Sequence, residues 1–224
     1  MIDADDTLWE NNILFESAID RFIQLVNHPE LSPLEVREAF DKLEAQRVKV
    51  HGYGTEAFHH SLVAGFEHLT GAPCTAEEAE LIAACAHSIR EAGLQIMEGV
   101  AETLPHLAER HTLVLVTKGD HAEQTTKLLQ SGLAHHFHHV EVLREKHVSA
   151  YLELCDRYGC DPASTWMIGN SPRSDVNPAL AAGMHAVYLP HPSTWVLEQE
   201  PIAAAQADRQ LLHLASFRDL KLHF

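Results

Sequence analysis

The chain has 224 residues, of which 46% are hydrophobic and 21% charged, a composition typical of a globular protein and not of a disordered chain. Its 32 acidic residues outnumber its 16 lysines and arginines, so the formal net charge is −16. A surface of this sign repels nucleic-acid phosphates and anionic lipids. We therefore expect neither a nucleic acid nor a membrane as a partner.

Localisation signals are missing from the sequence. No apolar run approaches the roughly 18 residues that span a bilayer. The acidic residues 1–6 lack the basic and apolar regions of a signal peptide. The four cysteines form no CxxC pair, a pattern that favours reduced thiols. We expect a cytoplasmic protein.

From about residue 11 to residue 110 the pattern is helical almost throughout. Capping boxes at Ser32 and Thr75 predict two helix starts. One apolar stripe recurs at the helical spacing, at Phe15, Ile19, Phe22, Ile23 and Val26. We expect residues 11–99 to form an inserted helical domain.

The rest of the chain, residues 1–10 and 100–224, is expected to form an α/β core. Short apolar runs alternate there with helical stretches, and the strand candidates are residues 113–116, 140–143, 166–168 and 186–189. This alternation predicts a Rossmann-like, doubly wound parallel sheet, whose ligands bind at the carboxyl ends of the strands. A last helix is expected from about Gln206, with the leucines Leu211, Leu212, Leu214 and Leu220.

Two carboxylates, Asp3 and Asp5, lie where the first short apolar segment ends. In an extended chain, side chains two residues apart point to the same side, so both can act on one substrate. Such a pair can supply a nucleophile, an acid/base and a magnesium site. An acidic N-terminal turn is the alternative interpretation of the same residues.

The ends of the next strand candidates carry groups suited to binding phosphate. Thr117 places a hydroxyl after the first of them, and Lys146 follows the second with a cation. Gly169 begins a turn after the third, and the carboxylate of Asp175 follows it. A nucleophile candidate, a hydroxyl, a lysine and a distal acid therefore occur in order on successive strand ends.

With these motifs the sequence resembles the haloacid dehalogenase (HAD) superfamily of phosphatases over nearly the whole chain. The motifs that carry the resemblance are Asp3-x-Asp5-x-Thr7, then Thr117, then Lys146, and finally Gly169-Asn170 with Asp175. The long helical stretch between the first two motifs is similar to the α-helical cap of one large subgroup.

The resemblance implies a two-step phosphoryl transfer from a small phosphorylated metabolite. Asp3 would attack phosphorus and form an aspartyl-phosphate, and Asp5 would act first as acid and then as base. Thr117 and Lys146 would hold phosphate oxygens and offset the charge of Asp3. The product would be inorganic phosphate.

The resemblance also implies Mg²⁺, held by the Asp3 carboxylate, the Asp5 main-chain carbonyl and the fourth motif. Asn170 stands where the family usually has an acidic ligand. An amide oxygen binds magnesium more weakly than a carboxylate, so Asp175 is the alternative ligand. Lys118 replaces an asparagine often found after the second-motif threonine, and it is a candidate for substrate binding.

Only Met1 and Ile2 precede Asp3, whereas strands usually have five or six residues. We therefore expect the native chain to begin further upstream. The short strand and Asn170 motivate one alternative, a catalytically impaired member that binds a phosphorylated ligand or partner without turnover. A phosphomutase is another. A dehalogenase is disfavoured because those enzymes lack the second aspartate, here Asp5.

Two further patterns bear on binding. Tyr53, between Gly52 and Gly54, could contact the leaving group of the substrate, although a plain interhelical turn has the same pattern. A dense group of histidines is expected to form a solvated loop and not a zinc site, because no cysteine or acid completes a tetrahedral set, and its members are His135, His136, His138 and His139.

Overall fold

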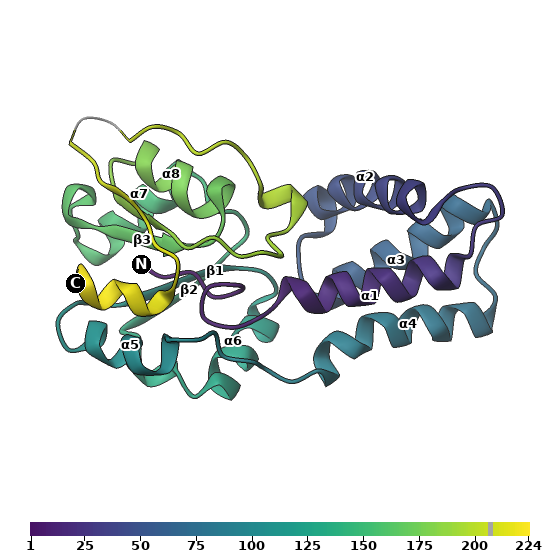
Figure 1. Ribbon diagram of the computed structural model, residues 1–224, viewed down its shortest axis with the longest axis horizontal. Helices are drawn as coiled ribbons and strands as arrows, with labels where there is room; N and C mark the ends of the chain where they lie inside the picture. Colours follow the sequence, from purple (N-terminus) through teal and green to yellow (C-terminus); the bar gives the residue numbers. More distant parts are fainter. Residues whose placement is uncertain (206–207) are drawn as a thin grey trace. The chain divides into compact units, whose positions relative to one another are not determined.

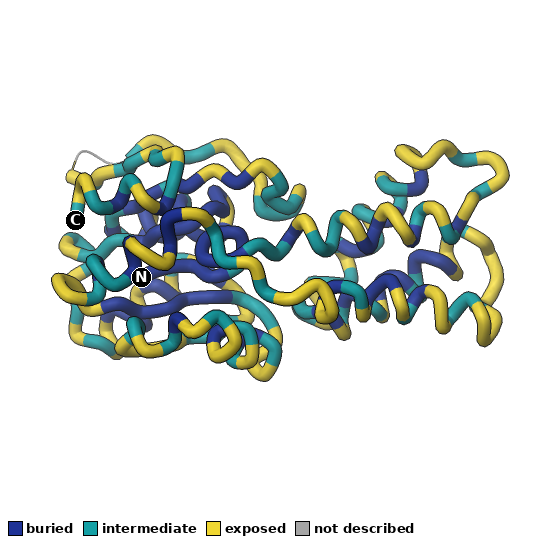
Figure 2. The backbone as a smooth tube through the Cα atoms, turned by 60° about the horizontal axis from the view of Figure 1, so that its bottom comes forward, coloured by how far each residue is buried: buried dark blue, intermediate teal, exposed yellow. Residues whose placement is uncertain are grey.

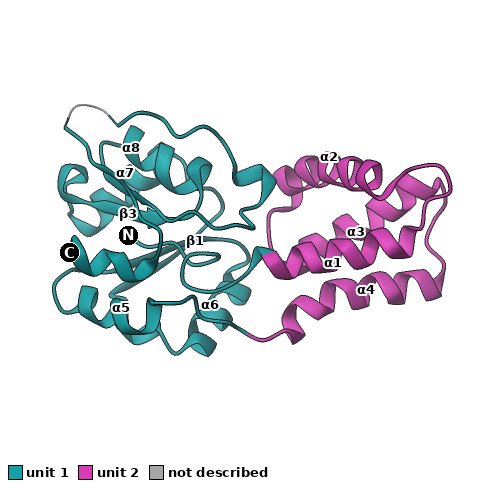
Figure 3. Cartoon of the chain, viewed as in Figure 1, with its two compact units in different colours: residues 1–12, 94–224 teal, residues 13–93 magenta. Residues whose placement is uncertain are grey.

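The computed structural model describes residues 1–205 and 208–224, and the chain divides into two compact units (Figure 3). Unit 1 comprises Met1–Asn12 and Leu94–Phe224, and unit 2 comprises Ile13–Gly93. The sequence pattern placed these boundaries after residues 10 and 99. Residues 94–99 belong to unit 1 because they pair with its first segment, where Trp9 forms an antiparallel bridge with Ile96.

Unit 2 is helical. Ser32 and Thr75 close the two capping boxes that the sequence predicts, each hydroxyl accepting from the main-chain N–H three residues later. Phe22 and Phe40 pack together in its core with ring centroids 5.2 Å apart. Its helices are α1 (Asn12–Val26, whose first residue belongs to unit 1), α2 (Pro33–His51), α3 (Thr55–Thr70) and α4 (Ala76–Glu91).

Unit 1 contains a parallel sheet, which confirms the α/β fold class. Its strands are β1 (Val114–Lys118), β2 (His139–Leu143), β3 (Trp166–Gly169), β4 (His185–Tyr188) and β5 (Leu211–His213). Strand β1 pairs with β2, and β4 pairs with both β3 and β5, always in parallel (Figure 1). The four strands expected from apolar runs are all present, within two residues of their expected bounds.

Residues 1–3 join the two halves of this sheet. Ile2 forms parallel bridges to Leu115 of β1 and to Ile168 of β3. Its N–H donates to the Val114 carbonyl over 2.8 Å, and the N–H of Asp3 donates to the Ile168 carbonyl over 2.9 Å. The segment is therefore the short central strand, and the order across the sheet is β2, β1, residues 1–3, β3, β4, β5.

Helices cover both faces of the sheet, as a doubly wound fold requires. Alternate residues of β1 point to opposite faces: Leu115 joins one core cluster with Leu104 and Phe217, while Val116 joins another with Tyr151. Figure 2 shows the buried backbone concentrated in the middle of unit 1.

The helices of unit 1 are α5 (Val100–Ala108), α6 (His121–Ser131), α7 (Val148–Tyr158) and α8 (Asn177–Ala181). Its short helical turns are η1 (Ala134–His136), η2 (Pro162–Ser164), η3 (Pro172–Val176), η4 (Val196–Glu198) and η5 (Phe217–Leu222).

The prediction of a last helix is wrong for the residues that the structure describes. Leu211 and Leu212 lie in β5, which extends the sheet, and Leu220 lies in the 3₁₀ turn η5. Leucine spacing alone does not separate a short buried strand from a helix. Gln206, the expected start of that helix, lies outside the described residues. Among the described residues, no helix combines the length and apolar character needed to cross a bilayer.

Candidate active site

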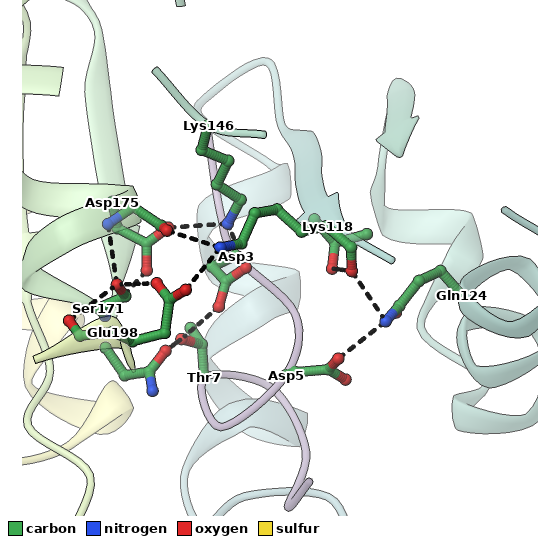
Figure 4. A network of polar contacts seen from close by, with 12 residues as sticks. Asp3, Asp5, Thr7, Lys118, Gln124, Lys146, Ser171, Asp175 and Glu198 are labelled. Carbon is green, nitrogen blue, oxygen red and sulfur yellow. Dashed lines mark hydrogen bonds and ion pairs between the residues drawn. The ribbon is translucent and has the colours of Figure 1, made fainter. Parts of the chain in front are cut away.

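The site is built around Asp3, which the central strand places at the carboxyl edge of the sheet. The side chain of Lys146, from the loop after β2, is 2% exposed and donates to the Asp3 carboxylate. The same ammonium donates to Asp175 Oδ1 over 2.8 Å. One buried cation thus lies between two buried carboxylates (Figure 4).

This charge arrangement shifts two pKa values. Burial, and then the negative charge of Asp175, raise the pKa of Asp3 to about 7, although Lys146 opposes the shift. Burial disfavours the charged ammonium of Lys146, but Asp175 and Asp3 outweigh it and raise its pKa. Two carboxylates and one ammonium leave one excess negative charge, which a bound cation would offset.

Oxygen atoms of Asn170, Asp5 and Thr7 converge beside Asp3. The side-chain oxygen of Asn170 lies 3.3 Å from Asp3 Oδ2 and 3.3 Å from the main-chain oxygen of Asp5. The hydroxyl of Thr7 lies within 3.3 Å of both the Asn170 oxygen and Asp3 Oδ2 and can donate to either of them. Adjacent oxygen ligands of Mg²⁺ at about 2.1 Å lie about 3 Å apart. The residues fit a magnesium site, because apart from the Thr7 hydroxyl the Asn170 oxygen faces two acceptors, Asp3 Oδ2 and the main-chain oxygen of Asp5. Rotating the amide by 180° would instead turn its N–H groups toward these atoms.

Asp175 has other partners in this structure. Its Oδ1 accepts from Lys146, and its Oδ2 accepts from the main-chain N–H of Ser171 over 3.0 Å. Gly169 leaves the room that this carboxylate occupies, since a Cβ there would lie 2.2 Å from Asp175 Oδ2. The structure thus brings Asn170 to the oxygens of Asp3 and Asp5, and it brings Asp175 to Lys146.

Thr117 and Lys118 end strand β1 at the same edge of the sheet. Thr117 is 1% exposed. The ammonium of Lys118 donates to Ser174 Oγ over 2.8 Å and to Glu198 Oε1 over 2.6 Å. Burial acts to raise the pKa of Glu198, but Lys118 and the hydroxyls of Ser171 and Ser174 hold it below its usual value. Glu198 was not predicted from the sequence, because it follows a segment with no periodic pattern.

The carboxylate of Asp5 is held by three side chains whose contacts with it were not predicted from the sequence. Trp9 Nε1 donates to it over 2.7 Å, Gln124 Nε2 over 2.8 Å and Lys127 Nζ over 3.0 Å. Trp9 is four residues from Asp5, and the other two are three residues apart on α6. Residues three apart on a helix share a face, and this spacing is the signal that could have indicated the pair.

Tyr53 belongs to unit 2, in the turn between α2 and α3, where Gly52 and Gly54 both have positive φ. Its part in substrate binding stays a prediction.

A second group of candidate metal ligands is Asp6, Glu10 and His191. Each has hydrogen-bond partners within the chain. His191 Nε2 lies 3.0 Å from Glu10 Oε2, and its Nδ1 accepts from the N–H of Ser193 over 3.3 Å. Asp6 Oδ1 accepts two main-chain N–H groups at the start of α1, at 2.8 and 2.9 Å. We assign this group a structural role.

Comparisons with known proteins identify a family and relatives of this chain. The family model of haloacid dehalogenase-like hydrolases matches residues 1–183. A glyceraldehyde 3-phosphate phosphatase of Methanopyrus kandleri is 28% identical over 199 residues, covering 84% of this chain and 82% of that protein. A phosphoserine phosphatase of Thermus thermophilus is 30% identical over 175 residues, covering 74% of this chain and 66% of that protein.

Solved structures agree as well. A haloacid dehalogenase-like family hydrolase from Xanthomonas campestris superposes with a TM-score of 0.81 at 26% identity, over 97% of this chain and 90% of that chain. The L-2-haloacid dehalogenase from Xanthobacter autotrophicus, at 15% identity and a TM-score of 0.64 over 98% and 94% of the two chains, shares the fold alone. The chain therefore belongs to the haloacid dehalogenase-like hydrolases, and its relatives named as phosphatases support a phosphoric monoester hydrolase among them.

Proposed function

We propose that the protein is a magnesium-dependent phosphatase that hydrolyses a small phosphomonoester through an aspartyl-phosphate on Asp3. The observation that carries the proposal is the position of Asp3, between the ammonium of Lys146 and the converging oxygens of Asn170 and Asp5. An anionic nucleophile approaches a phosphate dianion only where positive charge compensates both. Lys146 supplies one such charge, and Asp3, Asn170 and the Asp5 main-chain carbonyl would hold a divalent cation that would supply the rest.

In the first step, a carboxylate oxygen of Asp3 attacks phosphorus, the bond from phosphorus to the leaving oxygen breaks, and Asp5 protonates that oxygen. In the second step, Asp5 takes a proton from water, the water oxygen bonds to phosphorus, and the bond to Asp3 breaks. Inorganic phosphate is then released. The hydrogen bonds from Trp9, Gln124 and Lys127 orient the carboxylate of Asp5 for both transfers.

The remaining residues position and stabilise the phosphoryl group. Thr117 would donate its hydroxyl to a phosphate oxygen, and Lys146 would balance the charge of Asp3 while the bonds change. Magnesium, when bound, would neutralise charge on the transferring oxygens. Asp3, the Asp5 main-chain carbonyl and Asn170 would hold it, and Asp175 would act through Lys146. The shared oxygen cluster favours Asn170 over Asp175 as the direct ligand.

The proposed substrate is a small phosphorylated metabolite in the cytoplasm. The named substrates of the two relatives, glyceraldehyde 3-phosphate and phosphoserine, are small phosphomonoesters and set the first compounds to test. The net charge of −16 argues against a nucleic-acid substrate. Tyr53 and Lys118 are proposed to contribute to substrate binding.

The test is hydrolysis of p-nitrophenyl phosphate, glyceraldehyde 3-phosphate and phosphoserine with and without MgCl₂. Asp3→Asn keeps the side-chain shape and removes the nucleophile, while Asp20→Asn changes an exposed aspartate of unit 2 as the matched control. Magnesium-dependent phosphate release that is lost only in Asp3→Asn supports the proposal. Phosphate transfer to a sugar without net release would indicate a phosphomutase. No turnover by folded protein on any compound would indicate a binding protein.

A further inference from the structure

Glu198 places a carboxylate beside the site that is proposed to bind phosphate. It ends the turn η4, and its side chain is 13% exposed. Its Oε1 accepts from Lys118 Nζ over 2.6 Å, and its Oε2 accepts from Ser171 Oγ over 2.5 Å. The two oxygens therefore connect the end of β1 to the loop that follows β3.

The contacts of Ser171 carry this connection into the catalytic cluster. Its hydroxyl accepts from the N–H of Ser174 over 2.9 Å, and its own N–H donates to Asp175 Oδ2. Ser174 also accepts from the ammonium of Lys118 over 2.8 Å. Glu198 thus fixes Lys118 from one side while the loop holds it from the other (Figure 4).

An acid at this place is unexpected on electrostatic grounds. Anion sites normally collect uncompensated positive charge, yet both lysines of this edge are paired: Lys146 with Asp3 and Asp175, and Lys118 with Glu198. The pairing keeps Lys118 in one orientation and cancels most of its field at the end of β1. Both effects act on a phosphate held next to Thr117.

We propose that Glu198 is a positioning residue that holds Lys118 in place and limits how tightly the site retains inorganic phosphate. The inference rests on the proposed function, because it takes the end of β1 as the phosphate site. Without Glu198, Lys118 would lose its nearest counter-charge, and the site would bind its product more strongly and release it more slowly. Glu198 makes the charge of the cluster one unit more negative without removing the donor that Lys118 offers.

The decisive comparison is between two neutralised glutamates near the same ammonium. Glu198→Gln removes the charge 2.6 Å from Lys118 Nζ and keeps the shape and an acceptor for Ser171. Glu145→Gln removes a charge 3.9 Å from the same ammonium, on a side chain that is 45% exposed. Solvent screens the second charge, so its loss changes the field at the site much less.

Isothermal titration calorimetry with inorganic phosphate and MgCl₂ measures the effect directly. We expect Glu198→Gln to lower the phosphate Kd about tenfold. In this variant the charge of Lys118, several ångströms from the bound phosphate, no longer has Glu198 as its counter-charge. Glu145→Gln should change it less than about twofold, as expected of an exposed charge. Glu198→Asp, which retains the charge, should resemble the wild type, and adding Lys118→Met to Glu198→Gln should abolish the gain. In turnover, Glu198→Gln should lower kcat and KM together, whereas loss of loop structure alone would raise KM.

An unchanged or weaker phosphate affinity in folded Glu198→Gln would overturn the inference, as would an equal effect of Glu145→Gln. Absence of measurable phosphate binding by both the wild type and Glu198→Gln would overturn it too. Failure of the proposed function has a different signature. If the wild type hydrolyses no phosphomonoester but the affinity contrast holds, the proposed function fails and the role of Glu198 stands.

Discussion

The main chain of Gly169 lies directly against the carboxylate of Asp175, so that a Cβ on Gly169 would be 2.2 Å from Oδ2 and 2.4 Å from Cγ. No side chain fits there unless Asp175 moves. Because Asp175 holds the ammonium of Lys146, and Lys146 holds Asp3, a methyl group at residue 169 would displace the whole cluster.

Gly169→Ala tests this steric coupling. We expect kcat of the variant to fall at least about tenfold, because misplacing a catalytic group by about 1 Å can lower the rate up to about 10²-fold. We also expect the variant to require more Mg²⁺ for half-maximal activity. Gly65→Ala is the control, since its Cβ would meet Phe40 at 2.8 Å in unit 2. It should lower Tm and leave the Mg²⁺ requirement unchanged. Equal Mg²⁺ titrations for Gly169→Ala and the wild type would contradict the prediction.

Asp3→Asn should stabilise the protein in the presence of a chelator. Burial raises the pKa of Asp3 from its usual value of 3.8 to about 7. A raised carboxyl pKa means that the folded state binds the proton more tightly, so its contribution to stability is present below about pH 4 and is lost as the pH rises to about 7. The side chain of asparagine does not ionise, so Asp3→Asn does not lose this stability as the pH rises.

Thermal melts of both proteins across this pH range provide the measurement. At pH 8 in EDTA we expect the Tm of Asp3→Asn to exceed that of the wild type by about 3–6 °C. The gap should narrow toward pH 4. MgCl₂ should raise the Tm of the wild type more than that of the variant, because the ion binds the carboxylate. A lower Tm for Asp3→Asn at pH 8 would show that the pair with Lys146 outweighs burial.

Lys146→Met should destabilise the fold and inactivate the enzyme. It leaves Asp3 and Asp175 buried without their shared cation, and removal of one partner of a buried ion pair costs about 3–5 kcal/mol. Urea denaturation in EDTA measures this loss in the free energy of unfolding. Lys42→Met, at an exposed position of α2, is the control and should change it by less than about 0.5 kcal/mol. Equal losses in the two variants would disprove a special role for Lys146.

Trp9→Phe tests the orientation of Asp5. The variant lacks the indole N–H that donates to Asp5 Oδ1 over 2.7 Å. A hydrogen bond to a charged group contributes about 1.5–3 kcal/mol, so we expect kcat to fall about tenfold with little change in the Mg²⁺ requirement. Trp166→Phe is matched in chemistry but lies at the start of β3, stacked on His185, and should retain kcat. If Trp9→Phe kept the kcat of the wild type, the indole N–H would not be needed to position Asp5.

The sequence was sufficient to predict the strands that place the site. β-branched and leucine-rich runs identify β1 to β4, and the residues at or just after their carboxyl ends, Thr117, Lys146 and Asn170, all lie at one edge of the sheet. A short first strand ending at Asp3 was expected from its place before the first motif, because residues 1–3 are too short to show a period of their own; its bridges to Leu115 and Ile168 are seen only in the structure. Strand β5 was misread because Leu211 and Leu212 fit helical spacing as well as a buried strand.

The parts of the site missing from the sequence prediction are those that depend on distant contacts. Glu198 reaches Lys118 from 80 residues away, and no local pattern marks it. Gln124 and Lys127 share a helix face, but their target, Asp5, lies about 120 residues earlier in the chain. Local propensity carries no information on such pairings, which the topology of the sheet decides.

The position of Ile2 between Leu115 and Ile168 has a consequence for biosynthesis. The innermost strand can complete its pairing only after Ile168 has left the ribosome, which at 5–20 residues per second takes about 10–30 s after Ile2 is made. During that interval the edge of the segment that pairs with β3 has no partner, although the other edge can pair with β1 once Leu115 has been made. Closure of the sheet around this segment is therefore a late event that depends on contacts of high sequence separation, and substitutions at Ile2 should speed unfolding more than they slow folding.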